Sequence, residues 1–174
     1  MKILHIIAGA KEGGAESCAI DTIKALSKKG IDQTIICRPH DTFQNLVHDA
    51  RIKSYYLSFS FALKWLQKLQ INKIIKDEKP DIIHCWMNRA ASFTPMQKDI
   101  PTLGWFGGYY DLKYYQSCDY FMGVTKDIVR HIKEHIDEPD QAYVGHVFGT
   151  LDKIGEIKKS DFNIPDDAKI VLLL

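Results

Sequence analysis

Short apolar runs alternate with helix-like patterns along the chain. Continuous runs such as 3–8 and 81–87 are typical of strands inside a parallel sheet, because such strands have apolar neighbours on both faces. Segments such as 15–29, where apolar residues recur every three to four positions, are typical of amphipathic helices. We therefore expect strands over residues 3–8, 34–37, 54–59, 81–87, 102–106, 120–124 and 143–148.

Helical patterns fill most of the gaps between these strands. They are expected over residues 15–29, 42–50, 61–76 and 126–136. Gly30 follows the first of them and is a natural C-terminal stop. Right-handed connections between successive strands give a parallel sheet with helices on both faces. The pattern therefore predicts an α/β protein with a doubly wound, mostly parallel, Rossmann-like sheet.

The helix expected over 61–76 carries both a core stripe and a basic face. The side chains expected to pack in the core are Leu63, Leu66, Leu69, Ile74 and Ile75. Lys64, Lys68 and Lys76 fall within roughly 120° of arc at about 100° per residue. Such a face can dock on anionic lipid, although an ordinary solvated face is the more common arrangement.

A second pattern begins near the end of the sequence. Residues 147–167 are polar and turn-rich and are interpreted as a linker, and the apolar run 168–174 is typical of a buried strand. We therefore expect residues 1–165 to form one domain and residues 166–174 to begin a second, truncated domain. A final edge strand of the same sheet is the alternative.

Composition and charge narrow the classes of function. The 174 residues are 45% hydrophobic, and 23 Lys and Arg against 22 Asp and Glu give a formal charge of +1. This balance provides no overall field for nucleic acid or for an acidic membrane surface. The four cysteines are widely spaced, which argues against a zinc site and is typical of reduced thiols in a cytosolic protein. No apolar run reaches the ~18 residues of a membrane span, so we expect a soluble protein.

A glycine-rich loop follows the first expected strand, where ligands of doubly wound sheets bind. Its sequence over 9–16 matches neither the dinucleotide-binding fingerprint nor the P-loop of nucleoside triphosphatases. Gly13 and Gly14 at a helix start allow close approach of an anion to free N–H groups. A plain tight turn, with Glu16 satisfying the helix dipole, explains these residues equally well.

Polar and aromatic residues after two later strands are further candidates. Asn88 either caps the next helix or faces a ligand, and the guanidinium of Arg89 suits an anionic acceptor or a donor phosphate. Gly107 and Gly108 allow close approach of a ligand, and Tyr109 beside them can stack on a sugar. A flexible turn with surface tyrosines is the alternative.

Four other side chains are expected to be structural. Thr125 is expected to cap the helix that follows it, and His5 to be a satisfied core histidine. His131 and His135 have the i, i+4 spacing of two metal ligands. Without a third ligand nearby in sequence they are interpreted as solvated, and no metal site is expected.

Several short motifs, in this order along the chain, resemble glycosyltransferase family 4. Residues 1–5 leading to 13–16 resemble the opening of that family, and residues 80–84 (PDIIH) resemble its fourth-strand signature. Residues 107–126 resemble the corresponding acceptor-domain segment of transferases that build lipopolysaccharide core and other surface glycans. The resemblance covers roughly residues 1–150. It implies the N-terminal, acceptor-side half of a two-domain GT-B fold.

The resemblance also implies an activity. Members of the family retain the anomeric configuration, use a nucleotide-diphosphate sugar and generally need no metal or other cofactor. By likeness, the amides of Gly13 and Gly14 would face the donor diphosphate, with Glu16 anchoring the helix. His84 matches the first His of the signature, whereas Trp86 replaces the second and is a candidate to stack on a sugar face.

The expected partners are a nucleotide sugar and a surface-glycan or lipid-linked saccharide acceptor, with no nucleic acid. We expect a cytoplasmic protein that makes peripheral contact with an anionic membrane at its inner face. Residues 1–174 alone are expected to be inactive, because the C-terminal domain would hold the donor. A non-catalytic, truncated module that only binds a saccharide or a partner is the alternative, and the departure at Trp86 favours it slightly.

Overall fold

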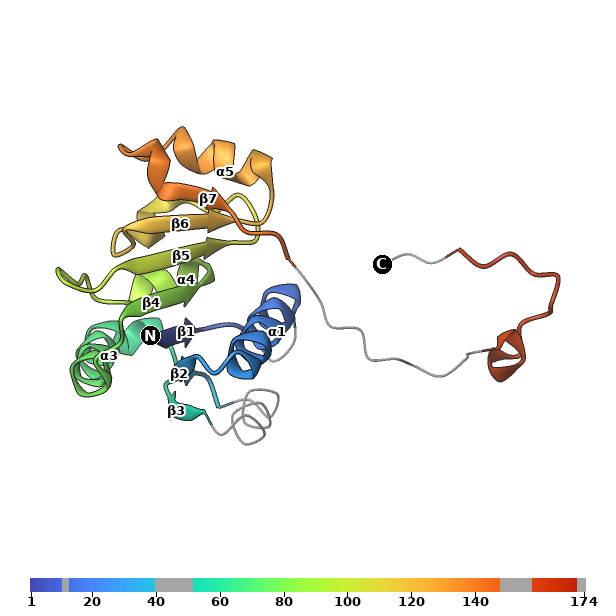
Figure 1. Ribbon diagram of the computed structural model, residues 1–174, viewed down its shortest axis with the longest axis horizontal. Helices are drawn as coiled ribbons and strands as arrows, with labels where there is room; N and C mark the ends of the chain where they lie inside the picture. Colours follow the sequence, from blue (N-terminus) through green and yellow to red (C-terminus); the bar gives the residue numbers. More distant parts are fainter. Residues whose placement is uncertain (11–12, 40–51, 148–157, 172–174) are drawn as a thin grey trace.

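The computed structural model describes residues 1–10, 13–39, 52–147 and 158–171. Within them seven strands form one sheet in the order β3-β2-β1-β4-β5-β6-β7, and all neighbouring strands are parallel (Figure 1). The strands are β1 (Lys2–Ile7), β2 (Asp32–Cys37), β3 (Lys53–Tyr56), β4 (Ile82–Trp86), β5 (Thr102–Phe106), β6 (Tyr120–Gly123) and β7 (Ala142–Val144). The predicted α/β, Rossmann-like class is confirmed.

Helices cover both faces of the sheet and bury two separate hydrophobic clusters. One face packs against α1 (Gly14–Lys28), and the other packs against α3 (Lys64–Glu78), α4 (Met87–Phe93) and α5 (Lys126–Lys133). Short 3₁₀ helices complete the described chain: η1 (Phe61–Leu63), η2 (Leu112–Tyr115), η3 (Pro139–Gln141) and η4 (Lys159–Phe162). Among these elements, no helix is long and apolar enough to cross a membrane.

The strand segments are apolar at consecutive positions because helices pack on both faces of the sheet. In β1, Leu4 and Ile6 join one cluster and Ile7 joins the other, so consecutive residues are all buried. α1 ends where predicted, because Gly30 adopts a φ of 72° that favours glycine.

The face covered by α1 is covered unevenly. Trp86, Trp105, Met122 and Tyr143 are successive neighbours across β4, β5, β6 and β7, so their side chains share this face. Trp86 and Trp105 are buried in the α1 cluster, but Met122 is only partly buried and Tyr143 is 55% exposed. No described helix packs over this end of that face.

Several element boundaries differ from those predicted. β3 ends at Tyr56 rather than at residue 59, and α5 ends at Lys133 rather than at residue 136. The helix predicted over 42–50 lies outside the described residues. In the apolar run 168–174, residues 168–171 do not form a strand, which corrects that part of the prediction, and the remaining residues lie outside the described part of the chain.

α3 turns a different side to the core from the one predicted. Its buried residues are Gln67, Ile71, Ile74, Ile75 and Glu78. The predictions for Ile74 and Ile75 are confirmed, whereas Leu63, Leu66 and Leu69 are exposed and those predictions are wrong. Gln67 supplies the reason, because its amide oxygen accepts the backbone N–H of Phe59 at 2.7 Å and its amide nitrogen donates to the same connection. This contact fixes the rotation of α3.

A buried carboxylate ties α3 to the far edge of the sheet. The Glu78 carboxylate accepts hydrogen bonds from Nζ of Lys2 at 2.7 Å, from Nζ of Lys53 at 2.5 Å and from the hydroxyl of Tyr55. Burial alone would raise the pKa of Glu78, but these hydrogen bonds outweigh it and lower the pKa to about 2. Glu78 therefore stays ionised in the folded protein at neutral pH.

Candidate functional site

The strand order reverses between β1 and β4, so the chain leaves these two strands in opposite directions along the sheet. A crevice forms at the carboxyl ends of strands where this happens, and ligands of such sheets bind there. Gly13 and Gly14 follow β1, and Asn88 and Arg89 follow β4. The fold therefore brings the two strongest groups of predicted site residues to one edge of the sheet.

Glu16 organises the loop after β1. Its carboxylate is buried and accepts the backbone N–H of Ala10 at 2.8 Å. A Cβ atom added to Gly9 would lie 1.8 Å from Oε1 of Glu16, and one added to Gly13 would lie 2.3 Å from its Oε2. The loop therefore wraps closely around this carboxylate, and glycine is required for that approach. Glu16 therefore holds the loop against the start of α1, and its part in donor binding stays a prediction.

The start of α1 is open to solvent above this loop. Gly13 is the N-cap residue and makes no side-chain capping hydrogen bond, and a Cβ on Gly14 would have no atom of a more distant described residue within 4 Å. Both glycines are exposed. Backbone N–H groups in the first turn of a helix lack intrahelical partners and favour an anion. This geometry suits a donor phosphate, which stays a prediction for Gly13 and Gly14.

Arg38 is a site residue that the sequence reasoning missed. Its guanidinium donates to the carbonyl oxygen of Ser58 at 3.1 Å and to that of Gly9 at 3.3 Å, so it joins the loops after β1 and β3. Burial, and then the neighbouring charge of Arg89, lower the pKa of Arg38. Its position directly after β2, at the carboxyl end of a parallel strand, was the available signal.

Arg89 lines a small hollow at the same edge. The hollow measures about 130 Å³ and is lined by Phe61, Asn88, Arg89, Ser92 and Tyr114. The guanidinium of Arg89 lies 5.5 Å from the centroid of the Phe61 ring and forms no ion pair with a carboxylate of the described residues. Asn88 is not the helix cap, because α4 begins at Met87. Both predicted residues therefore face the same opening.

His84 and Trp86 lie deeper than expected for sugar contacts. Trp86 is 1% exposed, and its indole N–H donates to Nδ1 of His5 at 3.2 Å. His5 in turn contacts Oε1 of Gln33 at 3.0 Å, and Gln33 donates to the carbonyl oxygen of Ile23 in α1. The chain of bonds explains why Trp86 is buried, and a ring in this position presents no free face to a sugar. The prediction that His5 is a satisfied core residue agrees with these contacts.

His84 is the one described residue with a buried side-chain polar atom that lacks a hydrogen-bond partner. Its Nε2 has none, and its ring lies 4.3 Å from that of Trp86 and 5.5 Å from that of His5. Burial, followed by the charge of His5, holds the pKa of His84 well below its usual range. The imidazole is therefore neutral at physiological pH, and a sugar-binding role for it stays a prediction.

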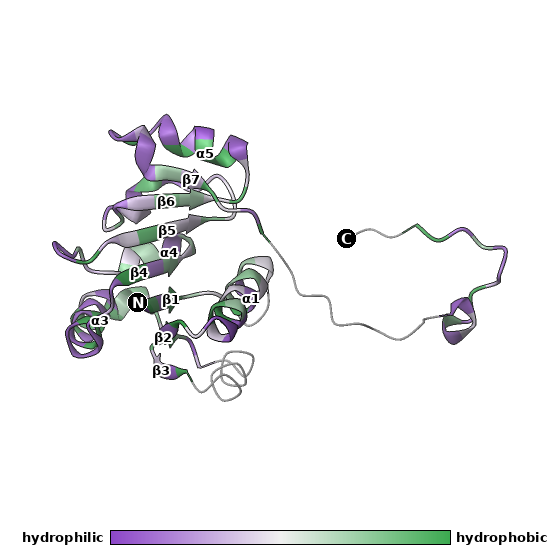
Figure 2. Ribbon diagram, in the orientation of Figure 1, coloured by the Kyte–Doolittle hydropathy of each residue, from purple (hydrophilic) through white to green (hydrophobic). Residues whose placement is uncertain are grey.

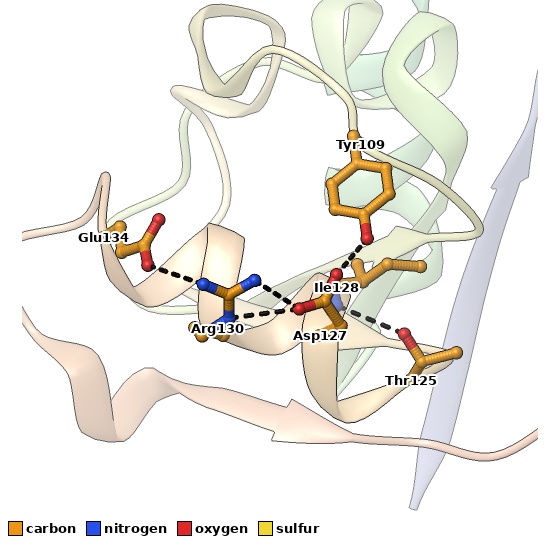
Figure 3. A network of polar contacts seen from close by, with 6 residues as sticks. All are labelled: Tyr109, Thr125, Asp127, Ile128, Arg130 and Glu134. Atoms are coloured by element: carbon orange, nitrogen blue, oxygen red, sulfur yellow. Dashed lines mark hydrogen bonds and ion pairs between the residues drawn. The ribbon is translucent and has the colours of Figure 1, made fainter.

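Tyr109 is held against the start of α5 (Figure 3). Its hydroxyl donates to the carboxylate of Asp127, which also pairs with Arg130, while Arg130 reaches Glu134 at 3.6 Å. The Tyr109 ring is 64% exposed and packs edge-on to His131. This arrangement leaves most of the ring open to solvent, as stacking on a sugar would require.

The glycines before Tyr109 have different roles. A Cβ on Gly107 would lie 2.5 Å from the Trp105 ring, so packing alone requires glycine there. A Cβ on Gly108 would make only ordinary contact with Tyr110, at 3.8 Å. Close ligand approach at these two positions therefore stays a prediction that the geometry permits but does not need.

Two structural expectations concern α5. Thr125 caps the helix as predicted, since its hydroxyl oxygen accepts the N–H of Ile128 at 3.2 Å. His131 and His135 lie with ring centroids 4.7 Å apart. Within the described part of the chain, no group of three potential ligands that could hold a metal ion is present.

Comparison with known proteins adds a family match. A sequence model of the family described as Glycosyltransferase Family 4 matches residues 12–144. The lipopolysaccharide core biosynthesis glycosyltransferases LpsD and LpsE of Rhizobium meliloti (strain 1021) are 26% and 25% identical to this chain. Each match covers 99% of this chain but only 50% and 51% of LpsD and LpsE. The chain thus spans about half the length of the curated relatives it matches.

A solved structure agrees with the fold. The crystal structure of Anabaena Alr3699/HepE in complex with UDP superimposes with a TM-score of 0.62 at 15% identity. The match covers 84% of this chain and 44% of that one. The predicted Rossmann-like half of a GT-B fold is therefore confirmed.

Proposed function

The chain belongs to glycosyltransferase family 4, and from this we propose that it is the acceptor-side domain of a retaining enzyme that transfers a sugar from a nucleotide-diphosphate sugar. The proposed acceptor is a surface glycan or a lipid-linked saccharide. The names of LpsD and LpsE support this acceptor class. We further propose that the transfer takes place in the cytoplasm and needs no metal or other cofactor.

The observation that carries the proposal is the grouping of cationic and glycine positions at the switch point of the sheet. Gly13 and Gly14 present the open start of α1, Arg38 bonds to Gly9 in the loop before it, and Arg89 is near enough for its charge to act on Arg38. Two guanidinium groups close to a helix start favour a ligand that carries phosphate or carboxylate groups.

The roles proposed for the two arginines differ. Arg38 is already bonded to the carbonyl oxygens of Gly9 and Ser58, so it holds the loops in place. Among the described residues, Arg89 has the Phe61 ring beneath it and no bonded partner for its guanidinium, so its donors are available for a ligand. We therefore assign acceptor binding to Arg89, with Asn88 and the exposed ring of Tyr109 as further contacts. In transfer of this type the protein contributes mainly by positioning the reactants and stabilising the departing phosphate.

The first experiment uses the longest natural form of the protein. A panel of nucleotide sugars is supplied with and without candidate saccharide acceptors, and release of the nucleoside diphosphate is measured. Acceptor-dependent release supports the proposal, and its absence across the panel contradicts it. Residues 1–174 alone should release none, so measurable transfer by this chain would refute the role of a partial enzyme.

A variant pair then tests the site. Arg89→Ala should raise the KM for the acceptor by roughly tenfold to a hundredfold, because one charge-assisted hydrogen bond contributes roughly 1.5–3 kcal/mol. The control is Lys29→Ala, which removes an exposed cation at the other end of α1. An unchanged acceptor KM in Arg89→Ala would contradict the assigned role.

A non-catalytic saccharide-binding module is the second candidate. The buried position of Trp86, where the family signature has its second His, favours it. This candidate predicts acceptor binding that depends on Arg89 in calorimetry, but no release of nucleoside diphosphate with any donor.

A further inference from the structure

Exposed apolar side chains form a band along η1 and the first two turns of α3. Their exposed fractions are 58% for Phe61, 48% for Leu63, 65% for Trp65, 40% for Leu66 and 59% for Leu69. We call these five residues the α3 ridge. Single exposed apolar residues are common, but neighbouring large ones mark a surface that contacts something else.

A small rotation of α3 about its axis would not bring the α3 ridge into the core of this domain. At about 100° per residue, Trp65 lies roughly 180° around the helix from Ile74, and Leu69 lies roughly 160° from Ile71. Ile71 and Ile74 are both buried in the main hydrophobic cluster. Turning the ridge inward would expose them and break the bond from Phe59 N–H to Gln67. The ridge therefore faces outward in the stable fold.

Lysines surround the ridge along the same helix. Lys64, Lys68, Lys73 and Lys76 all belong to α3, where Asp77 is the one exposed carboxylate. None of these four lysines forms an ion pair with a carboxylate in the part of the chain that the structure describes. Figure 2 shows hydrophilic and hydrophobic positions side by side on α3. The surface is therefore both apolar and positively charged.

Two of these lysines converge on a small hollow beside the ridge. Lys64, Lys68 and Lys113 line a hollow of about 100 Å³, and Lys113 also pairs with Asp111 at 2.6 Å. Burial, and then the charge of Lys64, lower the pKa of Lys68. Nζ of Lys64 lies 5.7 Å from the centroid of the Phe61 ring, so the cationic and apolar groups adjoin directly. A phosphate group entering this hollow would relieve the repulsion.

We propose that η1 and α3 form a docking surface for an anionic lipid bilayer. The α3 ridge would enter the boundary between headgroups and acyl chains, and the lysines would contact lipid phosphates. Charge complementarity selects this occupant, because protein–protein interfaces are depleted of lysine, whereas lysine stems can lie along apolar surface with their charge in the headgroup layer.

The position of the surface also fits the proposed acceptor. Phe61 belongs both to the ridge and to the hollow that contains Arg89. Docking would therefore place the acceptor-binding edge of the sheet next to lipid headgroups. Only this link to a lipid-linked acceptor rests on the proposed function, and the docking itself can be measured without sugar transfer.

Trp65 provides a direct test, because it is the exposed member of the chain's three tryptophans. Trp86 and Trp105 are 1% and 4% exposed. Vesicles of phosphatidylcholine mixed with phosphatidylglycerol should shift the emission of Trp65 to shorter wavelength, and brominated lipids should quench it. Vesicles of phosphatidylcholine alone should bind at least about tenfold more weakly. The variant Trp65→Phe should keep binding in co-sedimentation and lose the shift.

Matched variants separate the two parts of the surface. The double variants Trp65→Ser/Leu69→Ser and Lys64→Gln/Lys68→Gln should each lower the partition coefficient on mixed vesicles by roughly tenfold or more. Two controls remove similar groups elsewhere. Tyr143→Ser changes an exposed ring on β7, and Lys133→Gln changes an exposed lysine on α5. Circular dichroism establishes that each variant is folded.

Three results would overturn the docking proposal. One is an unchanged Trp65 emission with mixed vesicles. Another is an equal loss of binding in Lys133→Gln, which would show that general positive charge is sufficient. The third is self-association that disappears in Trp65→Ser/Leu69→Ser by sedimentation velocity, which would assign the ridge to a second copy of the chain. Transfer to a detergent-solubilised acceptor remains a separate readout of the proposed function.

Discussion

Replacing Gly9 by Ala should destabilise the protein through Glu16. The new Cβ would lie 1.8 Å from Oε1 and 2.7 Å from Cδ of Glu16, well inside contact distance. Gly9 is not in the left-handed region, so its backbone conformation is open to alanine. The carboxylate must therefore rotate away, and its 2.8 Å hydrogen bond from the Ala10 N–H is lost.

The size of the effect follows from that bond. A hydrogen bond to a charged group contributes about 1.5–3 kcal/mol, and Glu16 is buried, so we expect Gly9→Ala to lower the free energy of unfolding by about 2 kcal/mol. Glu16→Ala should cost about the same. In that background the obstacle is gone, and Gly9→Ala should be neutral or stabilise by up to about 1 kcal/mol, because alanine restricts the unfolded chain.

Urea unfolding of the four proteins, followed by far-ultraviolet circular dichroism, measures this coupling. The double-mutant cycle should give an interaction energy of about 2 kcal/mol between positions 9 and 16. Gly14→Ala is the control, because its Cβ would have no atom of a more distant described residue within 4 Å. If Gly9→Ala is equally destabilising with and without the Glu16 carboxylate, the reasoning about the loop is refuted.

Three further predictions concern single positions. Because the pKa of Glu78 is lowered to about 2 from 4.5, its stabilising effect should be complete above about pH 4.5 and disappear as the pH falls towards 2; Glu78→Gln should flatten this acid dependence in urea unfolding. Thr125→Ala should lower the free energy of unfolding by about 1 kcal/mol, and Thr125→Ser should restore most of it. Gly107→Ala should change the near-ultraviolet circular dichroism, because its Cβ would lie 2.5 Å from the Trp105 ring.

The sheet could be predicted because strands that are buried on both faces need apolar residues at consecutive positions, and this pattern is visible in the sequence. The runs containing Leu4 and Ile83 are apolar apart from a single histidine in each strand, and each became a central strand. The sequence also predicted that the candidate loops lie at one edge of the sheet, because the carboxyl ends of parallel strands all lie on the same side. Arg38 could have been included by the same rule, because it directly follows β2.

The orientation of α3 and the depth of Trp86 could not be predicted in this way. Apolar residues lie all round α3, so periodicity does not choose a buried side. The choice depends on Gln67, whose partners are backbone groups of an irregular connection. Trp86 ends an apolar strand, and its hydrogen bond to His5 joins positions 81 residues apart. A contact between positions so far apart in the sequence can be identified only from the three-dimensional structure.

The uneven cover of the α1 face affects how this domain behaves in solution. Tyr143 and Met122 continue the row of Trp86 and Trp105 beyond the reach of α1, and β7 is the last strand of the described sheet. An edge strand next to an uncovered apolar face is a site for association with other chains. We therefore expect the isolated domain to be prone to aggregation at high concentration, and Tyr143→Lys to improve its solubility without changing its stability.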